Sequence, residues 1–97
     1  MEAVDERPQK MLRCKASTDA AKLAGSIYST CQENSDSDVV LRVIGAGALN
    51  QAIKASIISN KYFAKKGFKV LLQPSFKDAG EQGTMTAIEL TVVLKKL

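Results

Sequence analysis

The alternation of hydrophobic and polar positions divides the chain into strand-like and helix-like segments. Residues 9–16 alternate between the two classes, which is typical of a short, half-buried strand. Residues 39–44 form a nearly unbroken aliphatic run, the composition of a strand buried on both faces. Residues 68–76 and 84–94 predict two further strands. Pro74 marks an edge strand or a bulge, because proline cannot donate a ladder hydrogen bond.

Two other segments repeat their apolar residues at helical spacing. The first helix is predicted over residues 20–31, where Ser17 or Thr18 can cap it with Asp19 in its first turn. The second is predicted over residues 48–66, and a rotation of about 100° per residue separates two apolar strips on it. The broader strip, expected to lie on the sheet, comprises Leu49, Ala52, Ile53, Ser56, Ile57, Phe63 and Ala64.

The predicted order of elements is β-α-β-α-β-β. It favours an α+β two-layer sandwich with both helices on one face of a four-stranded mixed sheet. A chain of 97 residues suits one domain, which we place at residues 9–97, after a charged, aperiodic tail at residues 1–8 that we expect to be disordered.

The location of the protein is predicted from what the composition lacks. No apolar stretch approaches the roughly 20 residues of a membrane-spanning helix, so we expect no membrane partner. Cys14 and Cys31 are too few for a disulfide scaffold. We therefore expect reduced thiols in a soluble intracellular protein, cytoplasmic or nuclear.

The turn between the aliphatic strand and the second helix is the sharpest chemical feature. Gly45, Ala46 and Gly47 leave unpaired backbone N–H groups at the mouth of a helix, where an anion can bind. Asn50 and Gln51 can contact such a ligand or only brace the turn. The structural explanation is equally good, because two glycines allow a tight turn into a closely packed helix.

The residue content argues against catalysis. The chain has no histidine, which removes His-assisted nucleophiles and His-containing metal triads. The carboxylates show no evident pairing, so we expect neither an enzyme nor a metal site. The glycine turn resembles the start of a dinucleotide fingerprint, but Asn50 occupies the place of the third glycine, and no cofactor is expected.

Positive charge gathers in the second half of the chain. The net charge is +4, and residues 49–97 hold eight lysines against Asp78, Glu81 and Glu89. A basic half is compatible with a polyanionic partner and equally with a simple solvated surface. The lysines predicted to contact phosphates are Lys15, Lys54, Lys61, Lys65, Lys66 and Lys77.

The narrower apolar strip of the second helix finds no place on a single sheet. It comprises Ala55, Ile58 and Tyr62, together with Gln51. Burying it against a second copy would stabilise a small domain. We therefore predict a homodimer, which can pair again into a tetramer, built from this helix and the C-terminal strands.

The segment GAGALNQAIKA, residues 45–55, closely resembles the signature of the stage V sporulation protein S (SpoVS) family. Residues 74–78 and 86–88 resemble that family's C-terminal hairpin, and residues 22–27 resemble its first helix. The resemblance implies a small domain related to the Alba fold, whose members bind DNA or RNA, usually as dimers. Alba proteins open their second helix with an arginine-glycine-arginine run. Glycines stand at both arginine positions here, so only backbone N–H groups remain there.

These observations lead to one leading hypothesis and two alternatives. The leading hypothesis is a non-catalytic protein that binds DNA or RNA mainly through phosphates, in regulation or packaging. The first alternative is a protein-interaction scaffold that uses the narrow apolar strip. The second is a sensor of small anions or nucleotides that uses the glycine turn.

Overall fold

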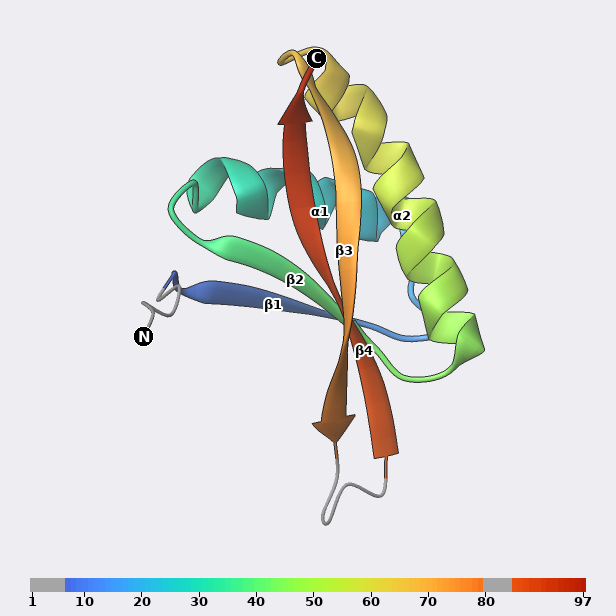
Figure 1. The fold of residues 1–97 in the computed structure, drawn as a ribbon. Helices are drawn as coiled ribbons and strands as arrows, with labels where there is room; N and C mark the ends of the chain where they lie inside the picture. Colours follow the sequence, from blue (N-terminus) through green and yellow to red (C-terminus); the bar gives the residue numbers. More distant parts are fainter. Residues whose placement is uncertain (1–6, 80–84) are drawn as a thin grey trace.

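The computed structural model describes residues 7–79 and 85–97. Its elements follow the predicted order β-α-β-α-β-β (Figure 1). They are β1 (Gln9–Cys14), α1 (Ala20–Glu33), β2 (Asp38–Val43), α2 (Ala46–Ala64), β3 (Phe68–Ala79) and β4 (Met85–Lys96). Most of the predicted tail, and residues 80–84 at the junction of the last two predicted strands, lie outside the described residues. Neither described helix is long and apolar enough to cross a membrane.

The four strands form one mixed sheet in the order β1-β2-β4-β3. Strands β1 and β2 are parallel, and β4 is antiparallel to both of its neighbours. Pro74 lies in β3, an edge strand, as predicted. Figure 1 shows the β1–β2 pair and the longer β3–β4 pair diverging from the middle of the sheet, with both helices on the same face. The predicted two-layer α+β sandwich is confirmed.

The core lies between the sheet and the two helices. Alternate residues of β2, namely Val39, Leu41 and Val43, face it, because successive side chains of a strand point to opposite faces. Helix α1 adds Leu23, Ala24 and Ile27, and β4 adds Leu90 and Val92. Helix α2 contributes mostly small residues, with Phe63 as its one large, fully buried side chain.

The rotation of α2 about its axis differs from the prediction. Ile53 and Ile57, expected on the sheet, are 39 % and 64 % exposed, whereas Ala55 and Ser59 are completely buried. Helix α2 packs against α1 and β3, so the face that it buries is the one between these two partners. The helix pattern by itself cannot reveal this, because the buried face takes Ala52 and Phe63 from the broader strip and Ala55 from the narrower one.

The strip assigned to a subunit contact is used inside the domain. The Tyr62 ring lies 5.5 Å from the Tyr28 ring of α1, between centroids, and Tyr28 also meets Phe63 edge-on at 5.0 Å. Ala55 is fully buried, and Ile58 packs against the core. The premise that nothing in the domain covers Ala55, Ile58 and Tyr62 is therefore wrong. Tyr62 forms part of the contact between α1 and α2.

Candidate nucleic-acid interface

The glycine turn packs tightly against the connection between β1 and α1. Gly45 is the N-cap of α2 and has φ 93°, a left-handed conformation that favours glycine. A Cβ atom at Gly47 would lie 2.9 Å from the Cβ of Ala16. Gln51 Nε2 donates a hydrogen bond of 2.7 Å to the carbonyl oxygen of Thr18. The turn and the connection thus form one compact unit at the carboxyl ends of β1 and β2.

The connection between β1 and α1 is also held by its own hydrogen bonds. Asp19, and not Ser17 or Thr18, caps α1, because its Oδ1 accepts from the backbone N–H of Ala21 (2.9 Å) and Lys22 (3.1 Å). Thr18 Oγ1 instead accepts from the backbone N–H of Lys15 at 2.8 Å. The backbone that presents Lys15 to solvent is therefore fixed.

Cys14 joins β1 to the first turn of α2. Its Sγ donates to the carbonyl oxygen of Ala48 at 3.4 Å, and the residue is buried. Burial raises the pKa of the Cys14 thiol, partly opposed by a side-chain hydrogen bond with Thr18. The thiol is therefore protonated near neutral pH and has a packing role.

These contacts divide the predicted anion-binding turn into bracing and open positions. Gln51 braces the connection, and Gly47 allows close packing, so both have a structural explanation. Asn50 is exposed and makes no side-chain hydrogen bond within residues 7–79 and 85–97. The first turn of α2 has no side-chain cap and no acidic residue, so its N–H groups are not occupied by a carboxylate.

The lysines are exposed and uncompensated. Every lysine is exposed, and none forms an ion pair within the part of the chain that the structure describes. The ion pairs found there join Arg7 to Asp38 (3.0 Å) and Arg42 to Glu89 (2.6 Å). The amino groups of the lysines are consequently available to an external polyanion.

The predicted phosphate contacts do not form one row. Lys54 and Lys61 lie on the exposed side of α2. The Nζ atom of Lys61 lies 5.5 Å from the centroid of the Tyr62 ring. Lys65 and Lys66 follow the end of that helix. The other two predicted contacts, Lys15 and Lys77, lie in the β1–α1 connection and in β3.

The structure places further lysines near the predicted phosphate contacts, and the sequence-based prediction did not include them. Lys69 of β3 lies directly opposite Lys95 of β4, and Phe68 is opposite Lys96. The backbone N–H of Leu97 donates to the carbonyl oxygen of Gly67 at 2.8 Å, which ties the end of β4 to the turn after α2. One end of the molecule, called here the lysine end, therefore gathers Lys65, Lys66, Lys69, Lys95 and Lys96. The strand register brings them together, and the sequence alone does not give that register.

The sheet face opposite the helices, called here the open face, is also basic. Leu41, Val43 and Leu90 point into the core, so the residues between them, Arg42 and Glu89, point to the open face. The same alternation places five cations there: Arg13, Arg42, Lys69, Lys77 and Lys95. Glu89 is engaged by Arg42.

The open face carries no aromatic side chain. The chain has two tyrosines, three phenylalanines and no tryptophan. Tyr28, Tyr62 and Phe63 belong to the helices, whereas Phe68 and Phe76 point to the helix side of β3. A platform for stacking bases is therefore absent from this face, and its chemical character is set by charge.

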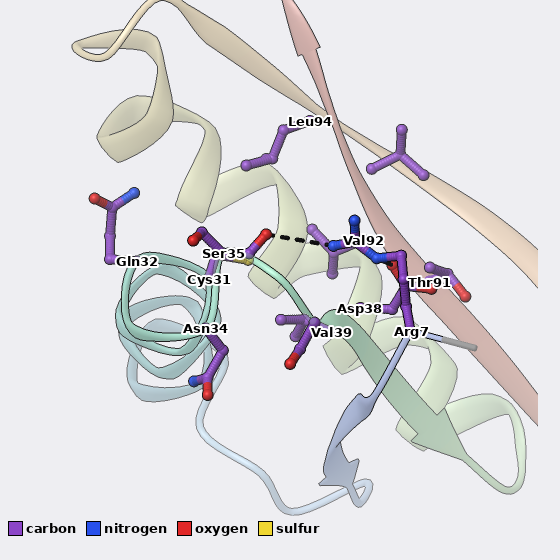
Figure 2. A pocket seen from close by; sticks show the side chains of 12 residues that line it. Arg7, Cys31, Gln32, Asn34, Ser35, Asp38, Val39, Thr91, Val92 and Leu94 are labelled. Carbon is purple, nitrogen blue, oxygen red and sulfur yellow. Dashed lines mark hydrogen bonds and ion pairs between the residues drawn. The ribbon is translucent and has the colours of Figure 1, made fainter. Parts of the chain in front are cut away.

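A hollow of about 460 Å³ is less suited to a polyanion. It lies where β4 diverges from β2, beside the end of α1 (Figure 2). Arg7 lines this hollow. Its guanidinium donates a hydrogen bond to the carbonyl oxygen of Ser35 (3.3 Å) and forms an ion pair with Asp38. Burial raises the pKa of Cys31, which also lines it, to about 11, so this thiol is not a nucleophile at neutral pH. No group of three potential metal ligands occurs among residues 7–79 and 85–97.

Comparison with known families agrees with this architecture. The model of a family described as Stage V sporulation protein S (SpoVS) matches residues 10–95. The match spans the glycine turn, the β1–α1 connection and every described strand almost completely. An Alba-like fold is compatible with the observed arrangement. The chain belongs to the stage V sporulation protein S (SpoVS) family.

Proposed function

We propose that this protein is a non-catalytic nucleic-acid-binding protein with a regulatory or packaging role. The name of its family connects that role with sporulation. The observation that carries the proposal is the absence of an ion pair at any lysine within the described chain, together with the exposure of all of them. Uncompensated cations are what a protein needs to displace counterions from a phosphate backbone.

Cations gather on the open face and at the lysine end. Lys69 and Lys95 lie directly opposite each other, an arrangement of like charges that costs stability unless something neutralises it. Because the open face lacks aromatic rings, binding would go through phosphates and show little sequence preference. Either DNA or RNA satisfies these requirements.

The test is a titration of labelled DNA and RNA oligonucleotides at several salt concentrations, read by fluorescence anisotropy. We expect binding at low salt that weakens steeply between about 50 and 200 mM salt. The double variant Lys69→Glu, Lys95→Glu should lose at least tenfold in affinity. Lys22→Glu, on the exposed side of α1, is the single-substitution control and should change affinity much less. No binding at low salt, or binding indifferent to salt, would refute the proposal.

We also propose that the protein forms a homodimer. Helix α2 buries mostly small residues and leaves two of its three isoleucines, Ile53 and Ile57, exposed. A second copy covering these side chains would remove apolar surface from water, which a small domain benefits from. A scaffold for an unrelated protein is the alternative that the same surface supports, and the oligomeric state separates the two.

A further inference from the structure

A smaller hollow lies on the open face at the carboxyl ends of β1 and β2. Its volume is about 280 Å³, and three cationic residues line it: Arg13, Lys15 and Arg42. Arg13 and Arg42 are direct partners in the parallel ladder of β1 and β2, so their side chains leave the sheet side by side. Lys15 follows Arg13 by two positions, in the connection to α1.

The charges around this hollow do not balance. Glu89 Oε2 accepts hydrogen bonds from Nε (3.0 Å) and Nη2 (2.6 Å) of Arg42. Neither Arg13 nor Lys15 has a carboxylate partner within the described chain. Like charges on directly opposite residues of neighbouring strands destabilise a sheet. A bound anion would remove this repulsion.

We propose that this hollow binds a phosphate group between Arg13, Arg42 and Lys15. Glu89 occupies the Nε and Nη2 side of the Arg42 guanidinium, which leaves its Nη1 donors for a ligand. A planar guanidinium matches the oxygens of a phosphate, and an ammonium adds a point charge. The backbone of Lys15 is already held by Thr18 Oγ1, which reduces the freedom lost on binding.

The inference deepens the proposed function and rests on it, since the expected phosphate is one from the backbone of a bound nucleic acid. It places a specific contact beside Glu89, near the middle of β4 and six residues along that strand from Lys95. Free phosphate or a phosphate monoester presents the same chemistry, so the experiment has one arm for each source.

The first arm measures oligonucleotide binding against salt for the wild type, the double variant Arg13→Gln, Lys15→Gln, and the single variant Lys10→Gln. Lys10 lies in β1, is exposed and does not line the hollow, which makes it a matched control of the same strand. Arg42 is left unchanged, because its substitution would leave the Glu89 carboxylate without its ion-pair partner. We expect the slope of log affinity against log salt to fall by about 1 to 2 in the double variant. Lys10→Gln should change the slope by much less.

The second arm titrates inorganic phosphate and follows the arginine Nε–H signals by NMR, with the double variant as the control. A selective shift of the Arg13 and Arg42 signals in the wild type supports the phosphate site. If oligonucleotides bind but the double variant behaves like Lys10→Gln, the inference is overturned while the proposed function stands. If oligonucleotides do not bind but phosphate shifts these signals, the proposed function fails and free phosphate is the ligand. If neither binds, both are overturned.

Discussion

A Cβ atom at Gly47 would lie 2.9 Å from the Cβ of Ala16, closer than two such carbons approach in folded proteins. The contact joins the first turn of α2 to the β1–α1 connection, next to the hydrogen bond from Gln51 to Thr18. Close packing therefore explains the glycine at position 47.

The change Gly47→Ala is expected to destabilise the protein by about 1–3 kcal/mol, because either the connection or the helix must shift. Gly25→Ala is the matched control, since nothing lies within 4 Å of its Cβ position on α1. In a helix interior that control should stabilise by roughly 0.5–1 kcal/mol. Urea denaturation measures both. Equal effects of the two substitutions would contradict the packing explanation.

Asn60 connects α2 to the outer edge of β3. Its Oδ1 accepts from the backbone N–H of Val70 at 2.8 Å, a group that has no strand partner on that side. Asn60→Ala should cost about 1–3 kcal/mol, since a part-buried donor is left unpaired. Asn50→Ala, at an exposed position of the same helix, should stay within about 0.5 kcal/mol of the wild type. Protection of the Val70 amide against hydrogen exchange gives a second readout, and it should fall only in Asn60→Ala.

The stability of the protein should depend on pH through Cys31. Burial raises the pKa of this thiol from 9.0 to about 11. Between these values the unfolded chain has lost the proton and the folded chain retains it. The free energy of unfolding therefore falls as the pH rises through this window, and the contribution is fully present below pH 9.

Denaturant titrations of the wild type and Cys31→Ala at pH 8 and pH 10.5 check this expectation. The fall in stability should be steeper in the wild type, because the variant lacks the thiol while Cys14 titrates in both. Parallel pH profiles would show that Cys31 is not the cause.

The proposed homodimer makes opposite predictions for two residues of α2. Ile57 is mostly exposed, so Ile57→Asp should leave the fold intact and shift the protein to a monomer in light scattering. Tyr62 packs on Tyr28, so Tyr62→Asp should lower the stability of the domain. A wild type that is monomeric at micromolar concentration, or an Ile57→Asp variant that assembles as well as the wild type, would exclude this surface.

The order of elements could be read from the sequence because it depends on local patterns. Alternation and helical spacing are properties of neighbouring residues, and so is the inability of Pro74 to sit in a central strand. Helix α2 nevertheless starts and ends two residues earlier than predicted. Gly45 alone makes the turn with its positive φ, which leaves Ala46 and Gly47 free to join the helix.

The sequence by itself determined the two-layer fold, the family and the excess of lysines, because each is carried by composition or by contiguous residues. Only the tertiary structure decided which side of α2 is buried, since the packing against α1 and β3 buries Ala55 and leaves Ile57 exposed. It also decided the candidate site. Arg13 meets Arg42, and Lys69 meets Lys95, through strand pairings between residues far apart in the chain. Such registers follow from how the whole domain packs, and no local pattern encodes them.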